Sequence, residues 1–207
     1  MENIKNIILD LGGVLINLDY DKVNDELGKL GLANAFTKSN QIDLFDNYEE
    51  GKISEKTFLN RFNQLAAVDH SHNKIIQAWN SILLDFPADR LTMINQLRDK
   101  YKVFLYSNTN FTHMKAVNSI LQREHSLENL NGYFDKVYLS HELGIRKPKP
   151  QGFKHILKTN NLVPKETLFI DDSPQHIEGA MQAGIYAEWL DLEKEDLKDA
   201  LTRLSLI

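Results

Sequence analysis

Four short segments, far apart in the chain, share one pattern: a run of apolar residues that ends abruptly at a polar side chain. They are residues 7–9 before Asp10, residues 103–106 before Ser107 and Asn108, residues 137–139 before Ser140, and residues 168–170 before Asp171 and Asp172. Unbroken apolar runs of this length predict strands buried on both faces, as in a parallel sheet covered by helices. Because parallel strands point the same way, their polar ends should gather along the edge where open α/β folds bind ligands.

Between the first two runs, the apolar residues follow helical spacing instead. They recur at positions i, i+4 and i+7, for example from Val23 and again from Phe58. A crossover between parallel strands needs only about a dozen residues, and this stretch is several times longer. We therefore predict that residues 17–86 form an inserted helical-bundle cap domain, and that residues 1–16 and 87–207 together form the core domain.

Regular alternation of helix and strand returns after residue 88. Helices are predicted around residues 91–97, 114–121, 153–157 and 177–181, with a last strand near residues 185–187 and a polar helix at the C-terminal end. The predicted fold class is thus α/β, with a doubly wound, mostly parallel Rossmann-like sheet and an inserted helical-bundle cap.

Composition and charge narrow the function classes. The hydrophobic content of 42% and charged content of 26% over 207 residues are ordinary for a soluble globular protein. A net charge of −5 without a basic block gives no general attraction for nucleic acid, so we expect no nucleic-acid partner. No apolar run approaches the roughly 20 residues of a membrane helix, so we expect no membrane partner and a cytoplasmic location. The absence of cysteine excludes disulfides and thiolate metal sites, and the sequence leaves open a monomer or a homodimer.

Three carboxylates are expected at the predicted sheet edge, from Asp10, Asp171 and Asp172. Like charges in a low-dielectric crevice either raise one another's pKa or are neutralised by a cation. Magnesium suits carboxylate and carbonyl oxygens and commonly keeps substrate phosphate oxygens as further ligands. One carboxylate at such a site can also act as a nucleophile and form an acyl phosphate.

Other residues at the same edge suit a phosphoryl group. Gly12 and Gly13 allow the backbone to approach an anion closely. Ser107 and Asn108 offer neutral hydrogen bonds, and Lys147 supplies positive charge. Each signal alone is weak, because such residues are common in turns and helix caps. Their occurrence together, each close to the end of a strand, favours phosphoryl chemistry.

Four motifs resemble those of the haloacid dehalogenase-like superfamily, and the resemblance covers nearly the whole chain. The motifs are residues 8–15, Ser107-Asn108, Lys147-Pro148 and residues 170–172. Within this superfamily, the chain is most similar to the bacterial phosphatases that act on α-glucose 1-phosphate. The resemblance implies a magnesium-dependent phosphatase that hydrolyses a small phosphorylated metabolite, such as a sugar 1-phosphate, through an aspartyl-phosphate intermediate.

The resemblance also implies a role for each motif residue. Asp10 would be the nucleophile and a Mg2+ ligand, with the Gly12 carbonyl and Asp172 as further ligands and Asp171 in an outer position. The phosphoryl oxygens would be held by Ser107, Asn108, Lys147 and the backbone at Gly12 and Gly13.

Two positions depart from the family pattern. Gly12 stands where most phosphatases of the superfamily carry a second Asp as general acid and base, and His176 stands where many relatives have Asn or Asp. The cap could supply the missing acid from Glu50, His70 or His72. Residues 48–52 and 79–80 are the expected determinants of substrate specificity.

Two alternatives remain open from the sequence. A 2-haloacid dehalogenase also lacks the second Asp, but it needs no magnesium and tends to have Ser and Asn in place of Asp171 and Asp172. It also uses an early arginine of the cap, and no arginine precedes Arg61 here. A regulatory protein that keeps only the fold is supported by Gly12 alone.

Overall fold

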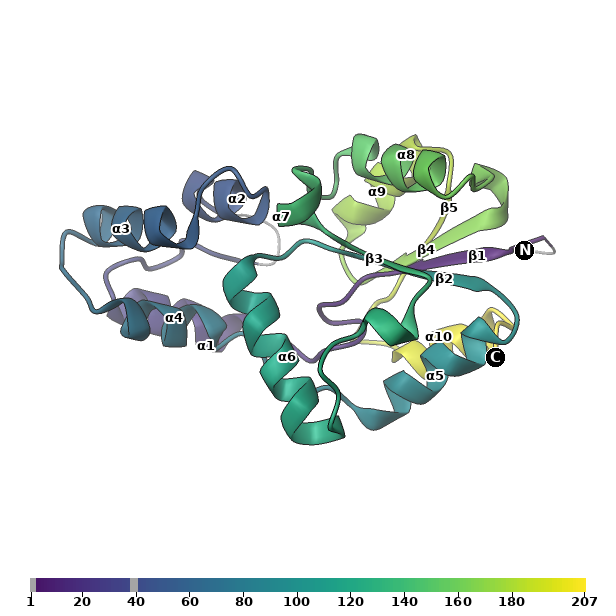
Figure 1. Cartoon of the computed structure of the whole chain (residues 1–207), viewed down its shortest axis with the longest axis horizontal. Coiled ribbons are helices and arrows are strands. Elements are labelled where there is room, and N and C mark those ends of the chain that lie inside the picture. Colours follow the sequence, from purple (N-terminus) through teal and green to yellow (C-terminus); the bar gives the residue numbers. More distant parts are fainter. Residues whose placement is uncertain (1–2, 38–40) are drawn as a thin grey trace.

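A computed structural model describes residues 3–37 and 41–207, and its centre is a five-stranded sheet (Figure 1). The strands are β1 (Asn6–Leu9), β2 (Lys102–Ser107), β3 (Lys136–Leu139), β4 (Thr167–Asp171) and β5 (Tyr186–Trp189). Their order is β3-β2-β1-β4-β5, and every pair is parallel. This arrangement confirms the sheet predicted from the apolar runs. The central strand is β1, which pairs with β2 on one side and β4 on the other.

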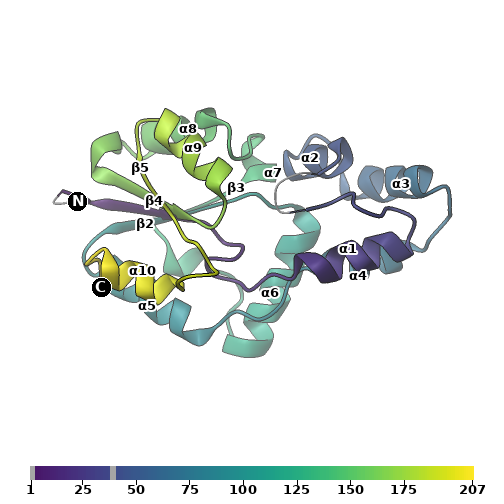
Figure 2. The same ribbon diagram turned by 180° about the vertical axis from the view of Figure 1, so that it is seen from behind.

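Helices cover both faces of the sheet, as Figures 1 and 2 show. One face is covered by α5 (Ala88–Arg98), α6 (Phe111–His125) and α10 (Leu197–Arg203), and the other by α8 (Pro150–Thr159) and α9 (Pro174–Gln182). Ile7 and Leu9 of β1 pack in the first layer, whereas Ile8 between them packs in the second. This alternation explains why three consecutive residues of β1, Ile7, Ile8 and Leu9, are all apolar.

Short elements complete the core. A one-turn helix, α7 (Ser140–Leu143), follows β3 directly, and two 3-10 turns, η1 (Asn131–Tyr133) and η2 (Pro164–Glu166), precede β3 and β4.

The helical cap inserted after β1 is also confirmed. It consists of α1 (Tyr20–Lys29), α2 (Asp43–Glu49), α3 (Glu55–Ala66) and α4 (His72–Asn80). These helices enclose a separate hydrophobic cluster in which the Phe45 and Trp79 rings stack at a centroid distance of 4.5 Å. The two segments that join cap and core pair with each other at Leu18 and Leu83. The exact domain limits, residues 17 and 86, stay a prediction.

Local features of the helices differ from the sequence pattern. The helix α2 was not predicted, because its seven residues are too few for a helical period to be visible. The C-terminal helix is not simply polar, since Leu197 and Leu201 are buried in the core. Leu65, on the predicted apolar stripe of α3, is 56% exposed because the helix ends two residues later in a left-handed turn at Ala67. None of the helices in the described parts of the chain combines the length and apolar character needed to span a bilayer.

Candidate active site

Three neighbouring strands bring polar side chains to one edge of the sheet. Asp10 follows β1, Ser107 ends β2 and Asp171 ends β4, and β1 lies between the other two. A cavity of about 100 Å3 lies between this edge and the cap. Of the residues predicted for the site, those that line the cavity are Asp10, Gly12, Ser107, Asn108 and Asp172. The cavity floor therefore comes from segments up to 162 positions apart in the sequence.

Lys147 is the charged centre beneath this floor. Its side chain is fully buried, and its Nζ lies 2.6 Å from Asp10 Oδ1 and 2.6 Å from Asp171 Oδ2. Both carboxylates are themselves buried. One ammonium group thus bridges the two carboxylates that end β1 and β4, and the bridge fixes the relative positions of these residues.

The three buried charges shift one another's pKa. Burial raises the pKa of Asp10 to about 8, and Asp171 adds to this rise while Lys147 opposes it. Burial acts the same way on Asp171, but Lys147 and His176 outweigh it and hold the pKa of Asp171 below its ordinary value. Burial lowers the pKa of Lys147, and the two carboxylates more than reverse that effect. Of the two carboxylates, Asp10 is therefore the one on which burial outweighs the positive charge of Lys147.

Asn108 holds the Lys147 segment through its side-chain amide. Its Nδ2 donates to the Lys147 carbonyl at 2.9 Å, and its Oδ1 accepts from the Lys147 backbone N–H at 2.8 Å. These two bonds occupy one donor and one acceptor of the amide. The structure therefore shows Asn108 as a brace for the lysine loop as well as a residue that lines the cavity.

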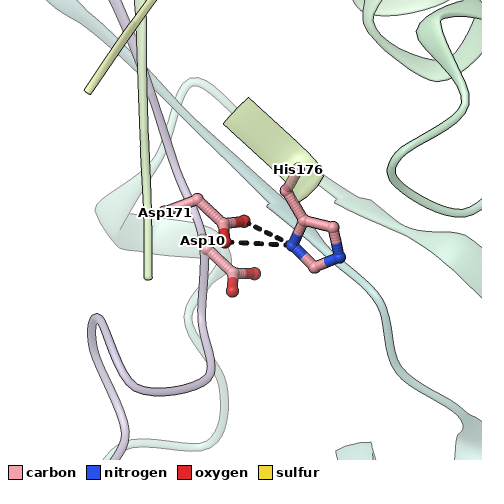
Figure 3. Close-up of side chains that lie close together, drawn as sticks. All are labelled: Asp10, Asp171 and His176. Atoms are coloured by element: carbon pink, nitrogen blue, oxygen red, sulfur yellow. Dashed lines mark hydrogen bonds and ion pairs between the residues drawn. The ribbon is translucent and has the colours of Figure 1, made fainter. Parts of the chain in front are cut away.

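His176 takes part in the same network, as Figure 3 shows. Its Nδ1 lies 2.9 Å from Asp171 Oδ1 and 3.0 Å from Asp171 Oδ2. Asp171 Oδ1 also accepts from the Ser173 N–H at 2.8 Å. With Lys147 on Oδ2, Asp171 has protein partners on both oxygens. Although ligand atoms of Asp10, Asp171 and His176 lie within 4.8 Å of one another, these bonds already use Asp171.

Asp172 lies next to the glycine turn after β1. Gly13 has φ +73°, and a Cβ added there would lie 2.5 Å from Asp172 Oδ2, so only glycine permits this approach. Asp172 and Gly12 line the cavity together with Asp10. This donor set of carboxylate and carbonyl oxygens fits the preference of Mg2+. The raised pKa of Asp10 agrees with a site for a cation beside it.

The cap contributes polar residues that the sequence analysis missed or misplaced. Tyr20, Gln41 and Glu49 line the cavity from the cap side, and Arg146 lines it from the loop before Lys147. Glu49 falls within the predicted segment 48–52, but no pattern in the sequence singled it out.

Other cap residues expected near the substrate do not line this cavity. The Trp79 side chain is fully buried in the cap cluster, so its expected role in specificity is not supported. His70 Nε2 is bonded to the Leu30 carbonyl inside the cap, His72 is exposed, and Glu50 is paired with Lys149. In this structure none of the three acids suggested from the sequence faces the cavity floor.

The chain is similar to known hydrolases. The chain matches the haloacid dehalogenase-like hydrolases over residues 4–184. It is 38% identical over 186 residues to a D-ribitol-5-phosphate phosphatase from Bacteroides thetaiotaomicron, covering 87% of this chain and 89% of the relative. It is 26% identical to a glyceraldehyde 3-phosphate phosphatase from Pyrococcus furiosus, over 96% of this chain and 89% of that protein.

A solved structure agrees with these relatives. A haloacid dehalogenase family enzyme from Bacteroides thetaiotaomicron, in complex with magnesium and inorganic phosphate, superposes with a TM-score of 0.84 at 36% identity, covering 95% of this chain and 98% of that chain. The similarity to a phosphatase of α-glucose 1-phosphate, expected from the motifs, was too specific, because the curated relative at 38% identity acts on a polyol 5-phosphate.

Proposed function

This chain belongs to the haloacid dehalogenase-like hydrolase family, and we propose that it is a magnesium-dependent phosphatase of a small sugar or polyol phosphate. The observation that carries the proposal is the buried bridge from Asp10 through Lys147 to Asp171, with Asp172 and the glycine turn beside it. The relative that acts on D-ribitol 5-phosphate and the solved structure with magnesium and phosphate support the same class.

Asp10 would act as the nucleophile. Its carboxylate would attack the phosphorus atom, the P–O bond to the alcohol would break, and an aspartyl phosphate would form. Lys147 orients Asp10 and places positive charge where the phosphoryl oxygens arrive. Ser107 and Asn108 line the same floor and would donate hydrogen bonds to those oxygens. Water would then hydrolyse the aspartyl phosphate and release inorganic phosphate.

The magnesium ligands proposed are Asp10, Asp172 and the Gly12 carbonyl, with Asp171 in an outer position. When bound, Mg2+ neutralises charge on the phosphoryl oxygens. The same positive charge would lower the raised pKa of Asp10 and keep the nucleophile ionised near neutral pH.

Two observations favour different members of the substrate class. The curated relative supports a polyol 5-phosphate, whose leaving group is a primary alcohol. Gly12 supports a sugar 1-phosphate, because an anomeric hydroxyl is more acidic and leaves more easily without a positioned acid. General acid catalysis contributes roughly 10²–10⁴-fold, so the difference between the two substrates is large enough to measure.

Rates across phosphate esters of graded leaving-group pKa, with Mg2+ and with chelator, test the proposal. The rates should require Mg2+. If no residue protonates the leaving group, as expected for an enzyme of sugar 1-phosphates, the rates should fall steeply as the leaving-group pKa rises. A flat dependence would mean that another residue supplies the acid. Gly12→Asp should flatten a steep dependence. Its Cβ would meet only the end of the Leu18 side chain within 3 Å, and that side chain can rotate away.

The same assay separates the alternatives. Halide release from 2-haloacids without Mg2+ would identify a dehalogenase, and no turnover of either substrate class would favour a regulatory protein. Asp171 and Asp172 favour the phosphatase, because a dehalogenase tends to have Ser and Asn at these positions.

A further inference from the structure

A buried carboxylate stands on the cap side of the cavity. Glu49 ends α2, is 5% exposed and lines the cavity that also contains Asp10. Its Oε2 accepts from Gln41 Nε2 at 2.9 Å and pairs with Arg146 Nη2 at 2.9 Å. Within the described part of the chain, no protein group binds Oε1. As far as the described residues are concerned, Oε1 can therefore accept a hydrogen bond from a molecule in the cavity.

The guanidinium group that pairs with Glu49 also pairs with a second carboxylate of the cap. Arg146 Nη1 pairs with Asp46 and Arg146 Nη2 with Glu49, so one guanidinium serves two carboxylates. Arg146 is the only Lys or Arg side chain among the described residues that line the cavity. Among the residues that the structure describes, the cap side of the cavity therefore offers a carboxylate and no unpaired cation.

Tyr20 lines the cavity together with Asp10 and Asp172 on the floor and Glu49 on the cap side. Tyr20 is partly buried, and its phenol has a raised pKa, caused by burial first and then by Asp172, Asp10 and Glu49 in that order. The phenol thus lies within electrostatic reach of both the floor carboxylates and Glu49. Because Asp10, Tyr20 and Glu49 line the same cavity, a leaving group attached to a phosphoryl group on the floor would share this cavity with Tyr20 and Glu49.

Building on the proposed function, we propose that Glu49 determines substrate specificity by accepting hydrogen bonds from a neutral, polyhydroxylated leaving group. The same carboxylate excludes leaving groups that carry a second phosphate or a carboxylate, because like charges repel strongly beside a buried carboxylate. Leu18, Phe36 and Ile82 line the rest of the cap side and suit the C–H faces of a sugar or polyol.

Glu50 provides a matched control for Glu49. The two residues are adjacent, each is 5% exposed, and each pairs across to the loop around Lys147, Glu50 through Lys149. Glu50 does not line this cavity. Glu49→Gln and Glu50→Gln therefore remove the same charge and the same kind of contact between cap and core, but only the first changes the cavity.

The test compares kcat/KM for D-ribitol 5-phosphate with kcat/KM for 3-phosphoglycerate, which carries a carboxylate, in the presence of Mg2+. The wild type should prefer the neutral polyol ester. Glu49→Gln should lower this preference about 10- to 100-fold, since a hydrogen bond to a charged group contributes about 1.5–3 kcal/mol and 1.36 kcal/mol is tenfold. Glu50→Gln should leave the preference unchanged.

Other outcomes overturn the inference. An unchanged preference in Glu49→Gln, or an equal loss in both variants, would mean that Glu49 does not read the leaving group. Hydrolysis of p-nitrophenyl phosphate reports separately on the proposed function: if the wild type hydrolyses no phosphate ester, that proposal has failed. Thermal unfolding shows whether each variant is folded. If Glu49→Gln does not fold, Glu49→Asp keeps the charge and must retain the exclusion of 3-phosphoglycerate while it weakens turnover of the polyol ester.

Discussion

The floor of the cavity, formed by core residues such as Asp10, and its roof, formed by cap residues such as Tyr20 and Glu49, are built in different ways. The floor is formed by the ends of parallel strands, and its charged groups are tied together by the buried Lys147. The roof belongs to helices with a separate hydrophobic cluster, which meet the core mainly through side chains such as Arg146 on Asp46. The floor is thus determined by the backbone of the sheet, whereas the roof depends on side-chain contacts that can vary without changing the fold.

One contact shows how closely the roof approaches the core. The end of α2 lies beside α7 in both views of the molecule (Figures 1 and 2). Gly51 has φ +65°, and a Cβ at this position would lie 2.1 Å from the His141 carbonyl oxygen. Only glycine permits this approach, so the cap is seated here by backbone shape as well as by charge.

The largest expected effect is on turnover, when the floor loses its nucleophile. Asp10→Asn keeps the shape of the side chain but removes the attacking carboxylate, so kcat should fall on the order of 10⁴-fold or more. Beryllium fluoride with Mg2+, which mimics the aspartyl phosphate, should raise the unfolding temperature of the wild type and not that of the variant. Near-normal turnover in Asp10→Asn would show that the floor does not act by covalent catalysis.

The next effect is on stability, when the floor loses its cation. Lys147→Ala leaves Asp10 and Asp171 buried without their shared partner, so the free energy of unfolding in chelator should fall by about 3–5 kcal/mol. Urea unfolding measures this change. Lys149→Ala is the control two positions away, because its side chain is 54% exposed and its ion pair should contribute at most about 1 kcal/mol. Equal losses in the two variants would contradict the difference between floor and roof.

A smaller effect is expected on the pH dependence of stability. The folded state raises the pKa of Asp10 from 3.8 to about 8, so between these values the folded protein holds a proton that the unfolded chain has released. The contribution of Asp10 to stability in chelator should therefore fall as pH rises from about 4 to about 8. Mg2+ should reduce this slope, and Asp10→Asn should remove the contribution of Asp10. Thermal unfolding of the wild type and of Asp10→Asn at several pH values checks the sign, because the comparison cancels the opposite effect of His113, whose pKa is lowered by burial to about 4. A wild type that gains stability relative to Asp10→Asn as pH rises in chelator would reject it.

The same difference between floor and roof explains what the sequence could predict. Asp10, Ser107 and Asp171 each end an apolar run, and parallel pairing is enough to bring such ends together. Glu49 and Tyr20 carry no comparable signal, because their position depends on how the cap packs against the core. The brace that Asn108 forms on Lys147 was also unpredictable, since it depends on the path of a loop 39 residues away.

The smallest expected effect tests the contact that holds α2 of the cap against α6 of the core. Tyr48 of α2 shares a hydrogen bond of 2.5 Å with Thr112 Oγ1 of α6, and Thr112 in turn donates to Glu55 at 2.8 Å. The Tyr48 hydroxyl also accepts from the Thr112 backbone N–H at 3.3 Å, so Tyr48→Phe removes two hydrogen bonds between cap and core and should lower the free energy of unfolding by about 1–2 kcal/mol.

The matched control for that substitution lies inside the core. Tyr138 Oη accepts from Asn160 Nδ2 at 2.6 Å, so Tyr138→Phe likewise removes a buried tyrosine hydroxyl and its hydrogen bond. Both variants should lose similar stability in urea unfolding. KM for a phosphorylated substrate should rise only in Tyr48→Phe, because only this substitution loosens the helix that carries Glu49. An equal change of KM in the two variants would mean that the contacts between α2 and α6 do not position the roof over the floor.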